Sequence, residues 1–219
     1  MAKIGRILRV GTGSTLHVLT MVLSLAMVWS GAQAADPDKA EAAKFLREIS
    51  ARAETMLVNR TLDTDQRKDV LEDLIASGFD LDAMSRFVLA KHWKTATPGQ
   101  REEFKSLFRD YMILTIGRHM DEIPRFELEV VAARTLGQNA LAMRSNLHFG
   151  EDRSTLYIDW RLRRHAGYWR IADIVVQGIS FASVIRSEFV AVIDTHGGEV
   201  ESLLAELRKK TLRYQAASG

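Results

Sequence analysis

Residues 125–177 contain four consecutive segments in which apolar and polar side chains alternate. They span 125–134, 138–149, 154–165 and 168–177, and short connections rich in Gly, Asn and Asp join them. Alternation of this kind is typical of half-buried strands, and such short connections suit hairpin turns. The region therefore predicts four antiparallel strands in consecutive order, with one apolar face and one solvated face.

Helical periodicity surrounds this strand region on both sides. Apolar residues recur every three or four positions in 39–58, 70–78, 79–88 and 97–116 before it, and in 180–193 and 200–207 after it. The clearest helix start is Thr97-Pro98, with Gln100 completing a capping box. The expected fold is a single α+β domain, with helices packed on one face of a curved four-stranded antiparallel sheet.

The first 34 residues have the pattern of an export signal. Lys3, Arg6 and Arg9 precede an apolar stretch over 16–29, and Ala32-Gln33-Ala34 follows it. A basic start, a short apolar run and a small-x-small end define a cleavable signal peptide. An uncleaved anchor helix is the alternative. We expect residues 1–34 to be removed and residues 35–219 to form the mature domain.

Composition limits what the mature domain can do. The chain has 30 basic and 28 acidic residues, and the leader holds three of the basic ones, so 27 remain against 28. A near-neutral domain of this kind is not expected to bind nucleic acid. The absence of cysteine excludes disulfides, thiol catalysis and thiolate metal sites.

Candidate catalytic groups are few. The histidines of the mature chain are widely spaced, and none has the spacing of a metal-binding pair, so no metal or cofactor is expected. Ser180, in Gly178-Ile179-Ser180-Phe181-Ala182, follows a strand and precedes a helix, as the nucleophile of an acyl hydrolase would. The same position suits a helix cap, which we favour because the sheet is antiparallel. No catalytic residue is expected.

The outer face of the predicted sheet carries charged residues. Asp159 and Asp173 fall on neighbouring strands and could form an acid–base pair, although a surface ion pair between Asp159 and an arginine is the simpler expectation. Arg161, Arg163 and Arg164 could bind phosphate or could form an ordinary solvated surface.

Large apolar side chains gather on the other face of the sheet and on the helices expected to cover it. This pattern of apolar side chains is compatible with a filled core and with a core that encloses a cavity. A cavity of that kind is the usual place for a ligand. The residues expected to line such a cavity are Phe87, Phe104, Phe108, Met112, Leu141, Met143, Ile158, Trp160, Trp169, Ile171, Val175 and Phe181.

Two stretches resemble a known family. One runs from Trp169 to Ser180 and continues with Arg186-Ser187-Glu188-Phe189; the other runs from Phe79 to Arg86 and on through Trp93 to Phe104. Together they closely resemble the MlaC family, periplasmic phospholipid-binding proteins of the Mla lipid-asymmetry system, also known as toluene-tolerance components. The likeness extends over nearly the whole mature chain, in order and with similar spacing.

The resemblance implies a hollow periplasmic domain that buries phospholipid acyl tails. Such a carrier works as a monomer between an outer-membrane lipoprotein complex and an inner-membrane ABC transporter complex, without a cofactor and without catalysis. The head group would lie near the cavity mouth, for which Arg86, Lys91 and Lys94 are candidates. The direction of transport is left open.

Three alternatives remain beside a phospholipid carrier. A related branch of the family accompanies hopanoid biosynthesis and shares the Arg-Ser-Glu-Phe segment and a glycine pair, although Ile179-Ser180 and the two tryptophans favour the phospholipid branch. A periplasmic acyl hydrolase would use Ser180. A protein-interaction module would have a filled core and would bind through its last two helices.

Overall fold

The computed structural model describes residues 36–59, 62–118, 124–149 and 154–218. Residues Asp36–Gly219 cluster into one compact unit. The predicted signal peptide lies outside the described residues, so its cleavage stays a prediction. Within the described ranges, no helix combines the length and the apolar character needed to cross a membrane.

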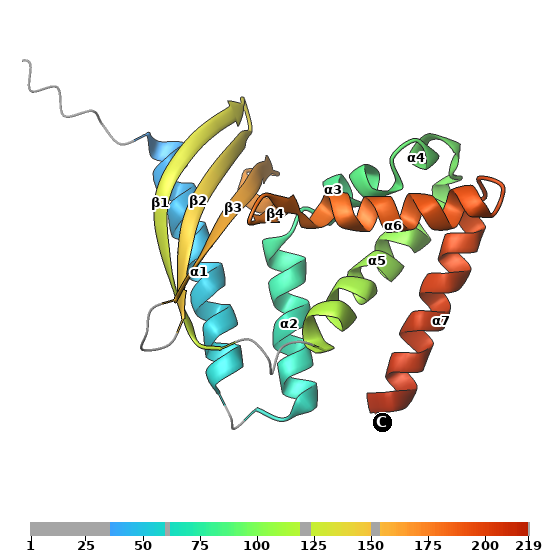
Figure 1. Ribbon diagram of the computed structural model, residues 1–219, viewed down its shortest axis with the longest axis horizontal. Helices are drawn as coiled ribbons and strands as arrows, with labels where there is room; N and C mark the ends of the chain where they lie inside the picture. Colours follow the sequence, from blue (N-terminus) through green and yellow to red (C-terminus); the bar gives the residue numbers. More distant parts are fainter. Residues whose placement is uncertain (1–35, 60–61, 119–123, 150–153, 219) are drawn as a thin grey trace, which may run out of the picture. The chain divides into compact units, whose positions relative to one another are not determined.

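The order of elements follows the predicted change from helix to strand and back to helix (Figure 1). The helices are α1 (Pro37–Val58), α2 (Thr64–Gly78), α3 (Leu81–Leu89), α4 (His92–Thr95), α5 (Pro98–Arg118), α6 (Phe181–Thr195) and α7 (Val200–Ser218). The strands are β1 (Phe126–Gly137), β2 (Ala140–Phe149), β3 (Ser154–His165), β4 (Tyr168–Val176) and β5 (Ile179–Ser180).

The strands form one antiparallel sheet in the order β1-β2-β3-β4-β5. The consecutive order is as predicted, but the sheet has a fifth, two-residue strand where four were expected. Gln177 and Gly178 both have positive φ, at 50° and 84°, and so do Ala166 and Gly167 at the preceding hairpin. Two successive positive φ values close the tightest hairpin turns, which is why the chain can add β5 before α6 begins.

A β-bulge in β4 changes which side chains face which way. Arg161 pairs with Asp173 but the next residue, Leu162, pairs with Ile171, so Ala172 is an extra residue. Beyond it, Ile174 lies opposite Trp160 on the apolar face, while Val175 lies opposite Asp159 on the charged face. Strict alternation from Ile171 placed Val175 on the apolar face, and the bulge corrects this.

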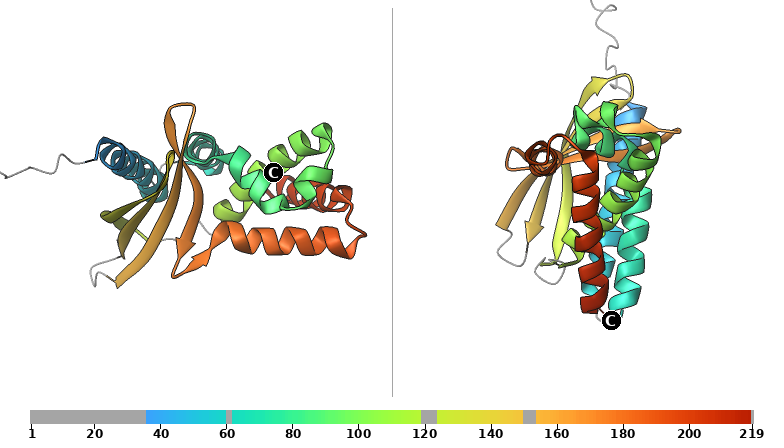
Figure 2. Two further views of the ribbon diagram at one scale, coloured as in Figure 1. Left: turned by 90° about the horizontal axis from the view of Figure 1, so that it is seen from above. Right: turned by 90° about the vertical axis from the view of Figure 1, so that its right-hand side faces the viewer.

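Helix α1 covers the apolar face of the sheet and forms one hydrophobic cluster with it (Figures 1 and 2). The buried members are Ala42, Leu46, Leu141, Met143, Leu162, Trp169 and Ile171. Arg164 of β3 fastens the start of α1, because its guanidinium pairs with Asp38 at 3.1 Å and also with Glu41.

A second hydrophobic cluster lies among the helices, mainly α2, α3, α5, α6 and α7. Phe104, Phe108 and Met112 of α5 are fully buried in it. These three residues therefore pack against other helices, and not against the sheet face as the sequence pattern led us to expect.

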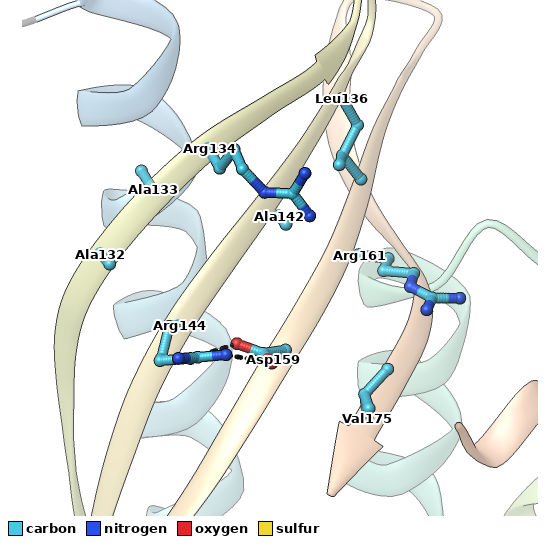
Figure 3. Close-up of a pocket in the computed structure, with 9 residues that line it drawn as sticks. All are labelled: Ala132, Ala133, Arg134, Leu136, Ala142, Arg144, Asp159, Arg161 and Val175. Carbon is cyan, nitrogen blue, oxygen red and sulfur yellow. Dashed lines mark hydrogen bonds and ion pairs between the residues drawn. The ribbon is translucent and has the colours of Figure 1, made fainter. Parts of the chain in front are cut away.

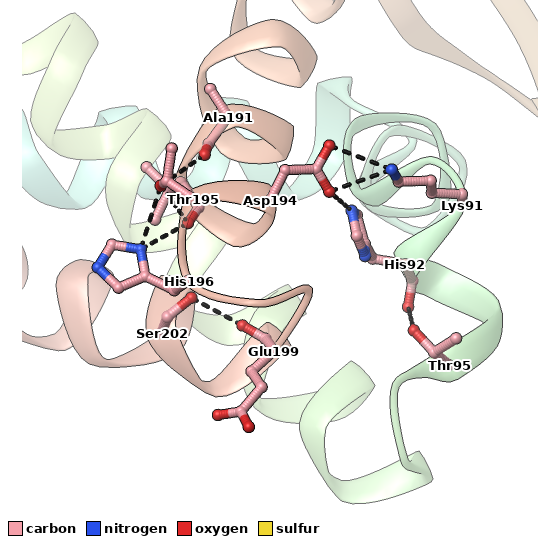
Figure 4. A network of polar contacts seen from close by, with 10 residues as sticks. Lys91, His92, Thr95, Ala191, Asp194, Thr195, His196, Glu199 and Ser202 are labelled. Atoms are coloured by element: carbon pink, nitrogen blue, oxygen red, sulfur yellow. Dashed lines mark hydrogen bonds and ion pairs between the residues drawn. The ribbon is translucent and has the colours of Figure 1, made fainter.

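Polar contacts join the α3–α4 corner to the end of α6 (Figure 4). Asp194 of α6 accepts a hydrogen bond from Lys91 at 3.1 Å, and its other oxygen lies 2.9 Å from Nε2 of His92. The hydrogen bond from Lys91 holds the pKa of Asp194 below its ordinary value. The short helix α4, which the sequence pattern did not separate from α3, is positioned by these contacts.

Helix α5 begins as predicted. The Thr97 hydroxyl accepts from the Gln100 backbone N–H at 3.2 Å, and the Gln100 side chain accepts from the Thr97 N–H at 3.0 Å, which completes the capping box. One turn further, Glu103 accepts a hydrogen bond from Nε of Arg208 at 2.6 Å, which ties α5 to α7. This bond holds the pKa of Glu103 below its usual value.

The Glu103 ion pair predicts a pH-dependent contribution to stability. Because the folded pKa is lowered, the contribution is present above the ordinary glutamate pKa of about 4.3 and is lost as the pH falls through the folded value. The melting temperature of the wild type should exceed that of Glu103→Gln at pH 6, and the difference should shrink below about pH 4.5. Glu188→Gln, at an exposed position of α6, is the control, and a difference that stays constant with pH would contradict the assignment.

Candidate functional site

A cavity of about 200 Å³ lies between α1, α2 and the apolar face of the sheet. Its wall is completed by Ile116 near the end of α5. The lining residues are Leu46, Ile49, Ser50, Ala53, Met56, Leu57, Leu71, Leu74, Ile75, Phe79, Ile116, Phe126, Leu128, Leu147, Trp160, Ile171 and Ile174.

The cavity wall follows from the periodicities of the elements around it. Leu46, Ile49, Ala53 and Leu57 recur every three or four residues on α1, so all four face the cavity from one side of the helix. From the sheet, Trp160 and Ile174 are cross-strand partners and reach the cavity together. The bulge in β4 is needed for this, because it turns Ile174 inwards.

The wall is almost entirely apolar. Among the lining residues that the structure describes, Ser50 contributes the one hydroxyl, and none is acidic, basic or histidine. The indole N–H of Trp160 donates to the Ser145 hydroxyl at 2.8 Å, so its polar edge is already satisfied by the protein. A wall of this composition favours hydrocarbon, and the described lining places no acid or base beside the Ser50 hydroxyl. Among the described residues, no cluster of side chains could hold a metal ion.

The structure brings only two of the predicted lining residues, Trp160 and Ile171, to this cavity. Leu141, Met143 and Trp169 are buried in the neighbouring cluster beneath α1. Ile158 is buried on the same sheet face, opposite Ser145 of β2.

The other predicted residues lie elsewhere in the fold. Val175 contributes to a groove on the opposite face of the sheet. Phe104, Phe108, Met112 and Phe181 belong to the helical cluster. Phe87 is 39% exposed on α3, with the guanidinium of Arg186 5.1 Å from its ring centre.

The residues suggested for the head group do not line the cavity either. Arg86 lies over the ring of Trp93, 5.8 Å from its centre. Lys91 is paired with Asp194, and Lys94 lies on the short helix α4. These cations belong to the α3–α4 corner.

Most of the cavity wall was not among the residues singled out from the sequence. The stripe of α1 was visible as a helical pattern, but nothing in it shows which surface that helix covers. Phe126, Leu128 and Leu147 follow the strand alternation in the same way. Leu128 pairs with Leu147, and Phe126 lies at the same end of the β1–β2 hairpin. That shared position is the feature of the sequence from which they could have been found.

Ser180 is a helix cap, as expected. Its hydroxyl accepts from the Ser183 backbone N–H at 3.1 Å and donates to the buried carboxylate of Asp173 at 2.6 Å. Asp173 also accepts from the backbone N–H of Ala182 at 3.0 Å and from Arg161 at 3.1 Å. Within the described part of the chain, the contacts of Ser180 include no histidine, so no acyl-hydrolase triad is assembled around it there.

A variant without this cap should be less stable but should carry as much bound lipid as the wild type. Ser180→Ala should lower the free energy of unfolding by about 1–2 kcal/mol, because α6 loses its cap and buried Asp173 loses a hydrogen-bond donor. Denaturant unfolding measures this. Background ester hydrolysis should be equal in both proteins, and a loss of activity specific to the variant would restore the hydrolase hypothesis.

Asp159 and Asp173 do not form an acid–base pair. Asp159 is bonded to Arg144 by two hydrogen bonds of 2.7 and 2.8 Å, so the expected surface ion pair is confirmed. Asp173 directly follows the bulged residue Ala172 in β4, and its carboxylate contacts the start of α6.

A model of the MlaC protein family matches residues 47–209. The chain belongs to the MlaC family. Its curated relatives in that family are distant. The toluene tolerance protein ttg2D of Pseudomonas putida is 19% identical over 62% of this chain and 63% of its own length. The MlaC binding protein of an intermembrane phospholipid transport system in Haemophilus influenzae is 20% identical over 67% of this chain and 69% of its own.

The fold comparison agrees with the MlaC assignment. A phospholipid-binding protein from Ralstonia solanacearum, solved in complex with a phospholipid, has a TM-score of 0.66. The match covers 80% of this chain and 96% of the other, at 16% sequence identity. The two chains therefore share an α+β fold.

Proposed function

We propose that this protein binds a phospholipid by its acyl chains and carries it across the periplasm. The observation that carries the proposal is the apolar cavity between α1, α2 and the sheet. Membership of the MlaC family supports it, as do the relatives named for phospholipid transport and the structural neighbour solved with a phospholipid.

The physical case rests on the cost of exposing hydrocarbon to water. Each methylene contributes about 0.8 kcal/mol when it leaves water, so two acyl chains of ordinary length amount to more than about 20 kcal/mol. A free lipid would rarely leave a bilayer against that cost. A carrier needs a dry cavity and needs no catalytic group, and the composition of this cavity fits that requirement.

Loading requires the cavity walls to separate. About 200 Å³ is below the range of about 300–1,000 Å³ that is common for ligand pockets, and two acyl chains are larger than most such ligands. The walls belong to two hydrophobic clusters, one of α1 with the sheet and one of the helices. We infer that a small displacement between them widens the cavity when a lipid enters.

The predicted partners follow from this role. A monomeric carrier would receive lipid at one membrane and deliver it at the other, through an outer-membrane lipoprotein complex and an inner-membrane ABC transporter complex. Maintaining outer-membrane lipid asymmetry is the proposed outcome of that exchange.

The test is the identity of what co-purifies with the protein. The full chain, expressed with its leader and purified from the periplasm, should carry phospholipid that native mass spectrometry and solvent extraction both detect. A hopanoid-related lipid in its place would assign the protein to the other branch of carriers. Well-folded protein with no bound lipid of either kind would refute the proposal.

A further inference from the structure

The charged face of the sheet carries a groove that the lipid cavity does not use. Its volume is about 620 Å³, and its charged lining residues are Arg134, Arg144, Arg161 and Asp159 (Figure 3). Helix α1 lies behind the sheet in this view, on the opposite face. In the part of the chain that the structure describes, no helix covers β1, β2 and β3 on the groove side (Figure 2).

The strand register places the three arginines around one alanine. Arg134 of β1 pairs with Ala142 of β2, and Ala142 pairs with Arg161 of β3, so the two arginines flank Ala142 in one row. Arg144 is two residues further along β2 and therefore projects from the same face. Ala142 lies between the three arginines, with the Arg134 guanidinium directed toward it, that of Arg144 toward Asp159 and that of Arg161 toward β4 (Figure 3).

The carboxylates nearby do not balance these cations. Arg144 is held by Asp159, and Arg161 donates one hydrogen bond to Asp173. Asp173 is buried and also caps α6, so its charge is not presented in the groove. The groove therefore keeps an excess of positive charge, and Arg163, two residues beyond Arg161, adds to it on the same face.

Apart from Asp159 and Asp173, a described acidic residue of this face lies at its other end. Glu129, near the start of β1, is 3.2 Å from Nε2 of His148. The basic region is thus confined to the half of the sheet near the β1–β2 hairpin. Leu136, on that half of β1, is 45% exposed and lines the groove beside the arginines.

We infer that this groove is a docking surface for an acidic segment of a partner protein. Exposed arginines combined with exposed aliphatic side chains are typical of protein interfaces. Arg134 and Arg161 are two strands apart, about 9–10 Å between backbones, which suits several carboxylates better than a single phosphate. Because the groove and the cavity are on opposite faces of the sheet, a partner could hold the carrier while its lipid stays in place.

The probe is a fluorescein-labelled peptide with glutamate at every second position and serine between, measured by fluorescence anisotropy at low ionic strength. Ala142→Glu, which places a carboxylate on the floor of the groove, should weaken binding about tenfold. Arg134→Gln should weaken it a few-fold. Arg47→Gln removes the same charge from the exposed side of α1 and should leave binding unchanged.

Further measurements separate this inference from its rivals. Added salt and a glutamine version of the peptide should abolish binding. Equal binding by wild type and Ala142→Glu would overturn the inference. So would displacement of the peptide by inorganic phosphate at equimolar concentration, or binding to phosphatidylglycerol vesicles that Ala142→Glu abolishes. The co-purified lipid of Ala142→Glu should match that of the wild type, so failure here is distinct from failure of the carrier proposal.

Discussion

Replacing Ala53 with tryptophan is expected to reduce bound phospholipid at least about tenfold while the protein remains folded. Ala53 lies on the cavity side of α1 between Ile49 and Leu57, and its methyl group leaves room in the wall. An indole at this position would occupy volume that acyl chains need. Excluding only a few methylenes costs more than the 1.4 kcal/mol that corresponds to a factor of ten.

The control for this change is Ala51→Trp, two residues earlier on the exposed side of the same helix. It adds the same side chain without entering the cavity, so its lipid content should equal that of the wild type. Lipid phosphorus per folded protein and native mass spectrometry give the occupancy, and thermal unfolding verifies the fold. Equal occupancy in both variants would mean that the lipid lies elsewhere.

Phe189→Ala is expected to cause the largest loss of stability, about 3–5 kcal/mol. Phe189 of α6 is 2% exposed and sits at the centre of an aromatic group. Its ring centre lies 5.9 Å from that of Phe104, 6.2 Å from Phe108 and 5.4 Å from Tyr111, all in edge-on contacts. Removing the ring leaves a cavity that α3, α5 and α7 cannot fill without moving.

This prediction also tests the division into two clusters. If the helical cluster is a filled core, folded Phe189→Ala should keep its lipid occupancy while its melting temperature falls by about 6–20 °C. Phe87→Ala, at a 39% exposed position, should cost about 1 kcal/mol or less. Lost lipid with unchanged stability would place the lipid among the helices instead.

Local chemistry made much of the fold predictable. Thr97 and Gln100 mark the start of α5 with a capping box, and Ser180 marks the start of α6, because a cap depends on residues adjacent in sequence. Alternation placed the inward residues of β2 and β3 correctly, such as Met143 opposite Trp160. These features depend on neighbours within a few positions or across one hairpin.

The cavity was less predictable because it depends on which helix covers which face. The sequence shows the apolar residues of α5, but not that Phe104 and Phe108 meet Phe189 of α6 in place of the sheet. It shows the stripe of α1, but not that this stripe covers the strands. Val175 was assigned to the wrong face for a local reason. The apolar–polar alternation up to Ile171 gives no sign that Ala172 is a bulge residue.

Photo-crosslinking with a phospholipid that carries a diazirine near the end of one acyl chain shows where the acyl chains lie in the protein. After loading and irradiation, peptide mass spectrometry should find adducts on α1, α2 and the first four strands, at residues such as Leu57, Leu74 and Leu147. Adducts confined to the helical cluster around Phe104 and Phe189, or no adducts on well-folded loaded protein, would contradict the account.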